Sequence, residues 1–267
     1  MTDLAPVYYL PHGGGPMPLM DDPNHAGLIR FLKALPATFA KKPEAIVLIS
    51  GHWEAAQPSV YAGKQHPMLF DYYGFPPATY EFKYPAPGAP ELAQRIASLL
   101  QAAGLPCLPE TQRGFDHGVF VPMLLINPMA DIPCIQLSLL KGLNPAAHLR
   151  LGLALQELRK ENVLILGSGM SFHNLQAVFA GEQPQLRAAS DEFHHWLLDT
   201  LSNDKSPEER LAALAAWDKA PYAHFAHPRA EHLLPLHVCA GIAGGAQAQV
   251  VFDEVLMNHK VAGFSWH

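Results

Sequence analysis

The stretch Ala45-Ile46-Val47-Leu48-Ile49-Ser50-Gly51-His52 decides the class of fold. Its uninterrupted apolar run is typical of a strand that is covered on both faces, as in a parallel sheet between helices. Two other stretches repeat the arrangement, because Val7–Leu10 leads to His12 and Val163–Leu166 leads through a glycine-containing turn to His173. Three predicted strands therefore each end close to a histidine.

Further strands and helices complete the pattern. Strands are predicted at Cys134–Leu139, where alternation with polar residues indicates a place nearer an edge, and at Val250–Phe252. The predicted helices are Pro90 to Gly104, Pro145 to Lys160, Asp191 to Leu201, Pro207 to Trp217, and one from about Glu231 to Gly241 or Gly244. Strands that alternate with helices predict an α/β fold with a central, mostly parallel or mixed sheet. Helices would flank both faces, and the active site would lie at the strand carboxyl ends.

The composition and net charge of the chain exclude several classes of function. Hydrophobic residues make up 49% and charged residues 16% of the 267 residues, which suffices for a full core. We find no linker-like segment and expect one domain over residues 1–267. The net charge of −6, without a basic run, argues against nucleic acid or an anionic membrane as a partner. No apolar stretch is long enough to span a bilayer, and Met1–Leu4 lacks the layout of a signal peptide. Three widely spaced cysteines fit a reduced, cytoplasmic protein: Cys107, Cys134 and Cys239.

The chain holds 15 histidines, and their positions matter more than their number. Ligands of open α/β sheets bind beyond the carboxyl ends of the strands, so His12, His52 and His173 are expected to meet at one site. Each of them alone is more often a hydrogen-bonded core or loop residue than a ligand. Three in the same context favour a shared site. Eight others are expected to be surface or packing residues: His25, His66, His148, His194, His195, His224, His259 and His267.

Two other segments hold histidines in unusual surroundings. In Gly114–Gly118, Asp116 either orients the imidazole of His117 or makes a local turn. The segment His227–His237 crowds three histidines and Glu231 at a predicted helix start. Nitrogen and carboxylate ligands dispersed along a chain suit a catalytic Fe(II) or Zn(II) centre with an open position. No nucleotide-binding glycine motif or serine-hydrolase elbow competes with this hypothesis.

A long loop between Gln57 and Pro90 is rich in proline and aromatic residues. Long loops within compact domains tend to be functional or disordered, and the aromatic residues argue against disorder. A packed wall beside the site and an ordinary surface loop are equally consistent with this composition.

Six segments, in this order and over nearly the whole chain, resemble the class III extradiol ring-cleavage dioxygenases, in particular the 4,5-DOPA dioxygenase-like branch. They are Pro11–Pro16 (PHGGGP), Ile49–Trp53 (ISGHW), Tyr84–Gly88 (YPAPG), Gly114–Gly118 (GFDHG), Gly169–Asn174 (GMSFHN) and Glu231–Leu236 (EHLLPL). The chain departs from the branch after His12, where Gly-Gly-Gly-Pro stands in place of the common Gly-Ser-Pro. This difference bears on the substrate more than on the metal.

The resemblance implies a role for each histidine. His12 and His52 match the first two metal ligands, and the His232 position supplies a further one. His173 matches the acid/base histidine, which can also reach the metal, and His117 matches a second active-site histidine that contacts the substrate. Fe(II) is the expected metal of the active enzyme because Zn(II) is redox-inert. Zn(II) could still occupy the purified protein and draw in His173 as a fourth ligand.

The third ligand has two candidates. Facial triads of non-heme iron usually combine two histidines with one carboxylate, which favours Glu231, whereas the resemblance favours His232. On a helix, neighbouring residues point about 100° apart, so only one of the two would face the metal. We choose His232 and expect Glu231 to support it.

Three functions remain for comparison. The first is a dioxygenase that inserts O2 into a catechol-type ring, acting as a monomer or a small homo-oligomer. The second is a zinc-dependent hydrolase that uses the same histidines to activate water. The third is a non-catalytic binding protein with an incomplete site, which is weakened because every histidine that the resemblance requires is present.

Overall fold

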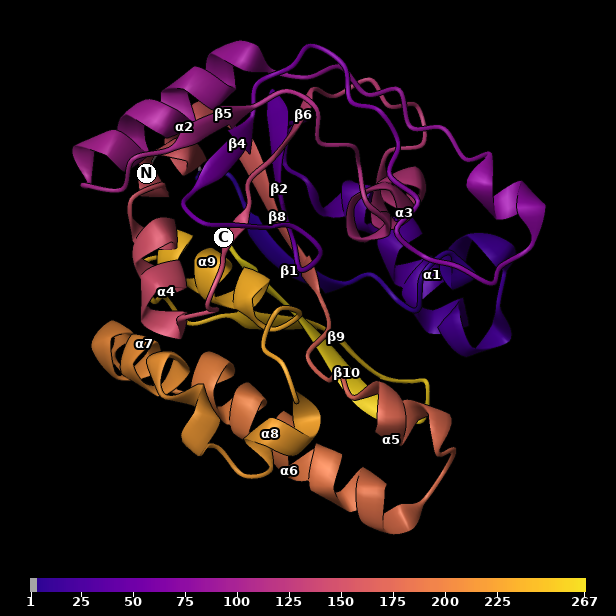
Figure 1. The fold of residues 1–267 in the computed structure, drawn as a ribbon. Coiled ribbons are helices and arrows are strands. Elements are labelled where there is room, and N and C mark those ends of the chain that lie inside the picture. The colour runs from indigo at the N-terminus through magenta and orange to yellow at the C-terminus, as the bar shows by residue number, and fades with distance from the viewer. Residues whose placement is uncertain (1–3) are drawn as a thin grey trace.

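A six-stranded mixed sheet forms the centre of the protein, whose computed structural model describes residues 4–267 (Figure 1). Residues 1–3, part of the segment tested above for a signal peptide, lie outside the described range. The strands, in spatial order, are β6 (Cys134–Gln136), β2 (Ala45–Ser50), β8 (Val163–Gly169), β1 (Val7–Pro11), β10 (His259–Trp266) and β9 (Gln249–Leu256). The first four run parallel, whereas β10 is antiparallel to β1 and β9 is antiparallel to β10. The predicted α/β class and the mixed sheet are confirmed.

The predicted strand Cys134–Leu139 is only partly right. Its first half, β6, lies at the edge of the sheet as expected. The chain then leaves the main sheet, because the N–H of Ser138 donates to the carbonyl of Ser59 and the N–H of Leu139 donates to that of Trp53. Leu139–Leu140 (β7) then forms a small parallel pair with β3 (Glu54–Ala55), and a separate small parallel pair joins β4 (Ser59–Tyr61) to β5 (Leu108–Glu110).

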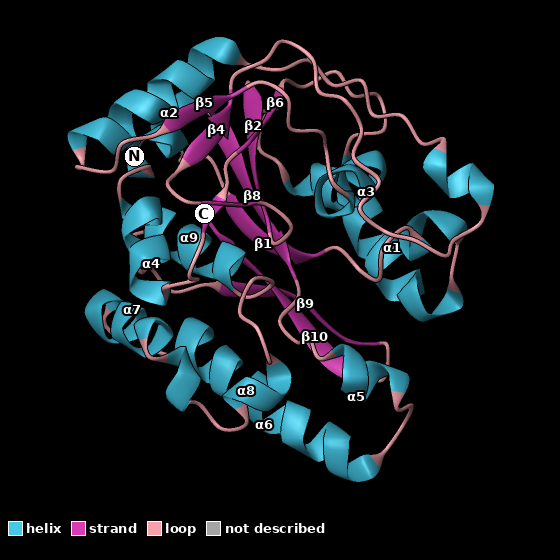
Figure 2. Cartoon of the chain, in the orientation of Figure 1, coloured by secondary structure: helices cyan, strands magenta, loops and turns pink. Residues whose placement is uncertain are grey.

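Helices cover both faces of the sheet, as predicted (Figures 1 and 2). The helices are α1 (Ala26–Ala34), α2 (Pro90–Ala102), α3 (His117–Ile126), α4 (Pro145–Leu153), α5 (Leu175–Phe179), α6 (Pro184–Ser202), α7 (Pro207–Ala215), α8 (Ala223–Ala226) and α9 (Leu234–Ile242). Two of them, α1 and α3, lie on one side, while α9, α4 and the α6–α8 group lie on the other. None of the helices within residues 4–267 has the length and apolarity required to cross a membrane.

Three predicted helices have wrong boundaries. The helix expected to begin at Asp191 begins at Pro184. The helix expected over Pro145 to Lys160 ends at Leu153, and a 3-10 segment follows at Gln156–Glu161. The last helix begins at Leu234 rather than at Glu231, with Pro235 in its first turn, where the missing N–H costs nothing. Glu231 therefore lies in the turn before the helix, so the argument from helical side-chain directions does not apply to it.

The predicted strand at Val250–Phe252 is one part of a longer hairpin. Strands β9 and β10 are joined by the two-residue turn Met257-Asn258, with φ angles of 50° and 71°. Positive φ at both central residues is the geometry that matches the twist of paired strands. Strand β10 was not predicted from the sequence, for two reasons. Met-Asn is not a typical hairpin dipeptide, and a glycine and a serine interrupt the apolar residues of the strand.

The order of the strands positions the site. β8 is inserted between β1 and β2, so the carboxyl ends of three parallel strands lie next to one another. Leu10 and Ser50, near the ends of β1 and β2, both pair with Ser168 of β8. The segments that follow β1, β2 and β8 therefore leave the sheet at neighbouring points of its carboxyl edge.

Candidate metal centre and active site

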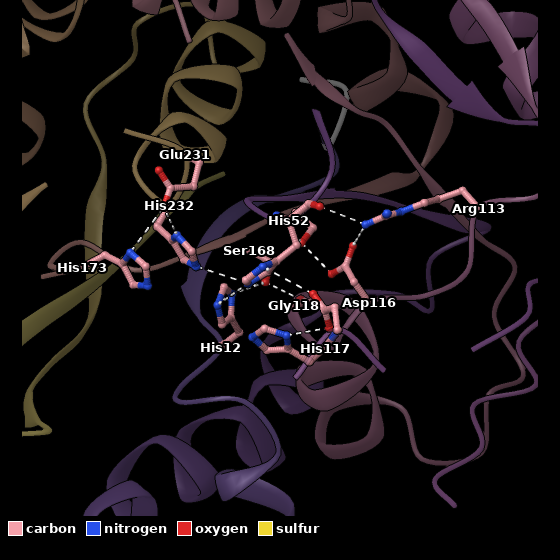
Figure 3. Close-up of polar contacts among 12 residues, drawn as sticks. His12, His52, Arg113, Asp116, His117, Gly118, Ser168, His173, Glu231 and His232 are labelled. Atoms are coloured by element: carbon pink, nitrogen blue, oxygen red, sulfur yellow. Dashed lines mark hydrogen bonds and ion pairs between the residues drawn. The ribbon is translucent and has the colours of Figure 1, made fainter. Parts of the chain in front are cut away.

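Three histidine nitrogens converge beyond the carboxyl edge of the sheet (Figure 3). The Nε2 atom of His52 lies 3.3 Å from Nε2 of His12 and 3.2 Å from Nε2 of His232. His12 follows β1, His52 follows β2, and His232 precedes α9. These separations equal those of neighbouring ligands about 2.0–2.1 Å from one metal ion.

The hydrogen bonds of His12 fix which of its nitrogens carries the proton. Its Nδ1 lies 3.0 Å from Oγ of Ser168. The Ser168 hydroxyl donates its single proton to the carbonyl of Gly118, so it accepts from His12. Nδ1 of His12 is therefore protonated, and its Nε2 presents a lone pair to the cluster.

The other two rings follow the same rule. Nδ1 of His232 lies 3.0 Å from a carboxylate oxygen of Glu231, and Nδ1 of His52 lies 3.4 Å from a carboxylate oxygen of Asp71. A carboxylate only accepts, so Nδ1 of His232 carries the proton, and the Asp71 carboxylate favours a proton on Nδ1 of His52. Metal-ligating histidines typically have such a partner, which fixes the tautomer and the ring orientation.

Three lone pairs that face one another repel unless a cation lies between them. Protonation would relieve the repulsion, but burial, the largest cause, lowers the pKa of His52 to about 4. Burial and the neighbouring histidines hold the pKa values of His12 and His232 well below the usual value. The neutral donor set fits a divalent transition metal and leaves further coordination positions free.

His232 is held at the centre by its own backbone. Its carbonyl accepts hydrogen bonds from the Tyr9 hydroxyl at 2.8 Å and from the Met170 N–H at 3.1 Å. A Cβ at position 169 would lie 2.0 Å from that carbonyl oxygen, so only glycine fits there. Glu231 contacts Nδ1 of His232 from outside the cluster, as expected of a supporting carboxylate.

His173 lies directly against His232. Its ring stacks on that of His232 with centroids 3.4 Å apart, and its Nδ1 lies 3.5 Å from the same oxygen of Glu231. The backbone N–H of His173 donates to the carbonyl of Ala226, and this hydrogen bond fixes the backbone at this position. The side chain is 21% exposed, so the ring borders both the cluster and solvent.

His117 lies on the opposite side, at the start of α3. Its ring centroid is 4.0 Å from that of His52 and 5.3 Å from that of His12. Sequence reasoning considered Asp116 as the residue that orients this ring, and the structure shows otherwise. The Asp116 carboxylate instead accepts from Oγ of Ser50 and from the guanidinium of Arg113.

The residue that orients His117 is Asp71, which sequence analysis missed. One carboxylate oxygen accepts from Nδ1 of His117 at 2.8 Å and from its backbone N–H at 2.9 Å. Burial raises the pKa of Asp71, but the hydrogen bonds from His117 and the nearby His52 outweigh it, and the pKa falls to about 2. No local motif marks Asp71, because its partner lies 46 residues further along the chain.

The aromatic loop packs beside the site. Tyr72, next to Asp71, has its ring centroid 6.0 Å from that of His117. The ring of Phe75 lies 3.4 Å from where a Cβ of Gly15 would be, so it covers the glycine turn that follows His12. Of the two alternatives, the packed wall is correct.

The other histidines of the crowded segment 227–237 point elsewhere. Nε2 of His227 donates to the carbonyl of Ser171 at 3.0 Å, and Nε2 of His237 donates to that of Leu214 at 2.8 Å. Both rings are buried and take part in packing.

An α/β sheet that ends in a multi-histidine centre defines a class of metal-dependent enzymes. Comparison with known families makes the assignment specific. Residues 6–264 match the family model described as the catalytic LigB subunit of aromatic ring-opening dioxygenase, and the chain belongs to this family.

Named relatives agree with this assignment. A dioxygenase of Hapsidospora irregularis, tasH, is 43% identical, with 98% of this chain and 86% of the relative covered. A protein of Beta vulgaris named 4,5-DOPA dioxygenase extradiol is 40% identical, with 94% and 92% covered. An uncharacterized Escherichia coli K12 protein of known crystal structure aligns with a TM-score of 0.78 and 27% identity, over 98% of this chain and 100% of that one.

The protein is thus an aromatic ring-opening dioxygenase, and the resemblance to the extradiol class is confirmed. The alternatives of a zinc-dependent hydrolase and of a non-catalytic binding protein are not favoured. Its substrates are an aromatic compound and O2.

Proposed function

We propose that the protein cleaves a catechol ring outside its two hydroxyl groups, with a 3,4-dihydroxyphenylalanine-like compound as substrate. The names of several relatives support this substrate class, since the proteins from Beta vulgaris, Portulaca grandiflora and Escherichia coli K12 are each named 4,5-DOPA dioxygenase extradiol. The aromatic wall at Tyr72 and Phe75, close to His117, suits a planar aromatic ring.

The observation that carries the proposal is the convergence of three unprotonated Nε2 atoms. We assign His12, His52 and His232 as the metal ligands and Fe(II) as the metal of the active enzyme. Bound Fe(II) would supply the redox chemistry for O2 and a Lewis acid for the catechol oxygens. The neutral state of the three rings keeps them available as ligands at neutral pH.

His173 is assigned as the general acid and base. A proton on its Nδ1 would be held by Glu231, so Nε2 is the nitrogen available to take a proton from a substrate hydroxyl. A neutral imidazole near pH 7 can accept that proton and return it later. When zinc occupies the site, the same ring would turn to become a fourth ligand. His117, on the other side of the cluster, would contact the substrate.

An oxygen-electrode experiment tests the proposal. Anaerobically purified protein, reconstituted with Fe(II), is expected to consume O2 in the presence of 3,4-dihydroxyphenylalanine. The expected product is yellow and contains both atoms of the consumed O2. The zinc-loaded protein, measured in parallel, is expected to be inactive because Zn(II) is redox-inert. Equal activity of the two metal forms, or a hydrolysed product without O2 uptake, would refute the proposal.

Three broader proposals accompany this function. Residues 1–267 would form a single catalytic domain, which the match over residues 6–264 supports. The protein would act as a monomer or a small homo-oligomer. A cytoplasmic location is supported by three unpaired cysteines, of which Cys134 and Cys239 are buried.

A further inference from the structure

Asp71 connects the aromatic loop to His52 and His117 of the candidate site. The loop is first attached through its backbone, because the N–H of Phe115 donates to the carbonyl of Pro67 at 2.9 Å and the N–H of Leu69 donates to that of Phe115 at 2.8 Å. The next hydrogen bond joins the residues two positions further along each segment, because the backbone N–H of His117 donates to the carboxylate of Asp71. The carboxylate thus continues the ladder of hydrogen bonds in place of a backbone carbonyl.

The two carboxylate oxygens of Asp71 serve different rings. Oδ1 accepts from Nδ1 and from the backbone N–H of His117, while Oδ2 lies 3.4 Å from Nδ1 of His52. The side chain is 20% exposed, so most of its surface is covered by these neighbours. With both its N–H groups bound to one oxygen, His117 has a defined position and a single tautomer.

The arrangement mirrors that of Glu231 across the cluster. Glu231 contacts the ligand candidate His232 at 3.0 Å and His173 at 3.5 Å. Asp71 likewise contacts the ligand candidate His52 and the substrate-side His117. On each side, one carboxylate therefore holds one cluster histidine and one neighbouring histidine in related orientations.

We propose that Asp71 is a positioning residue for ring cleavage, which holds His117 as the Nδ1-protonated tautomer so that its Nε2 accepts a hydrogen bond from the substrate. The inference rests on the proposed function of the site. A ring fixed in this way offers a lone pair to a catechol hydroxyl, whereas the other tautomer would present an N–H and disfavour a hydroxyl donor. Asp71 acts through His117 and does not itself touch the substrate.

The test compares Asp71→Asn with wild type and with Asp131→Asn. The control removes an equivalent carboxylate from an exposed ion pair with Lys42, before the amino end of β6. Supporting residues of this kind are typically worth about 10–100-fold in activity. We expect Asp71→Asn to lower kcat by that factor, with metal stoichiometry at saturating Fe(II) and thermal stability close to those of the control.

A measurement of the tautomer separates this inference from the proposed function, because it needs no turnover. In zinc-loaded protein labelled with ¹⁵N-histidine, the His117 signals are identified by their loss in His117→Gln. Wild type is expected to show the Nδ1-protonated pattern, and Asp71→Asn is expected to lose it, since the amide can donate to Nδ1. An unchanged tautomer in Asp71→Asn, or a loss of metal parallel to the loss of kcat, would overturn the proposal. Absence of ring cleavage by wild type would instead refute the proposed function.

Discussion

Histidines with a lowered pKa lie in two kinds of surroundings in this protein, and the pKa does not distinguish them. His52, in the cluster, and His237, in α9, both have a pKa lowered to about 4, with burial as the largest cause. Nε2 of His237 donates to the carbonyl of Leu214. Nε2 of His52 instead faces the nitrogens of His12 and His232. What distinguishes the proposed ligand from the packing histidine is the partner of each nitrogen, and a lowered pKa alone does not indicate a site.

The strongest test of this comparison is to remove one cluster nitrogen. His12→Ala, His52→Ala and His232→Ala are each expected to lose most of the bound metal, because two nitrogens hold an ion far less firmly than three. Turnover should fall by at least ~10³-fold, since a catalytic metal contributes several kcal/mol to the reaction.

Elemental analysis of reconstituted protein measures the metal, and circular dichroism verifies the fold. His237→Ala is the matched control, which removes a buried histidine outside the cluster and should keep full metal content. A cluster variant that binds as much metal as this control is not missing a ligand, and that assignment would be withdrawn.

His173 sharpens the distinction within the site. His173→Ala is expected to retain Fe(II) and to lose about 10²–10⁴-fold in kcat, the usual contribution of a general acid or base. The reason is geometric, because its ring stacks on His232 without entering the group of three Nε2 atoms. Single-turnover kinetics of the iron-loaded variant, with iron measured in the same sample, provide the test. If iron is lost in proportion to activity, His173 is a ligand and its proposed role is wrong.

The packing histidine should affect stability and leave chemistry intact. His237→Ala creates a cavity in α9 and leaves the buried carbonyl of Leu214 without its donor. We expect a loss of about 2–4 kcal/mol in the free energy of unfolding. Urea denaturation of chelated protein measures this change, and kcat of the metal-loaded variant should stay within about twofold of wild type, a change below ~0.5 kcal/mol. A large drop in kcat would mean that the packing and site histidines are not separate.

The smallest expected effect is a change in pH dependence. The pKa of His237 is about 4 in the folded protein and 6.5 in the unfolded chain, so the unfolded state binds one more proton between these values. Its contribution to stability is present above pH 6.5 and is lost as the pH falls toward 4. His237→Gln cannot titrate, so between pH 6.5 and about 4 its stability should fall less steeply than that of wild type, by up to about 1.4 kcal/mol per pH unit. Parallel curves of unfolding free energy against pH would show that the pKa of His237 is the same in the folded protein and in the unfolded chain.

The sequence predicted the histidines of the site better than the carboxylates. A histidine just beyond an apolar run is visible locally, and parallel strands bring such positions together whatever lies between them. Glu231 and His232 could not be separated in this way, because the argument assumed a helix that begins only at Leu234. Asp71 carried no local signal, since the interaction that gives it a role joins two distant segments.

The sequence by itself determined the α/β class, the strands that end in His12 and His52, and the family resemblance, because each depends on patterns within a few residues. Only the tertiary structure decided that β8 lies between β1 and β2. It also decided which nitrogen of each ring faces the centre, because a proton on Nδ1 is fixed by an acceptor such as Ser168 or Asp71 that comes from elsewhere in the chain. Strand order and hydrogen-bond direction arise from contacts between distant segments, which local sequence patterns do not record.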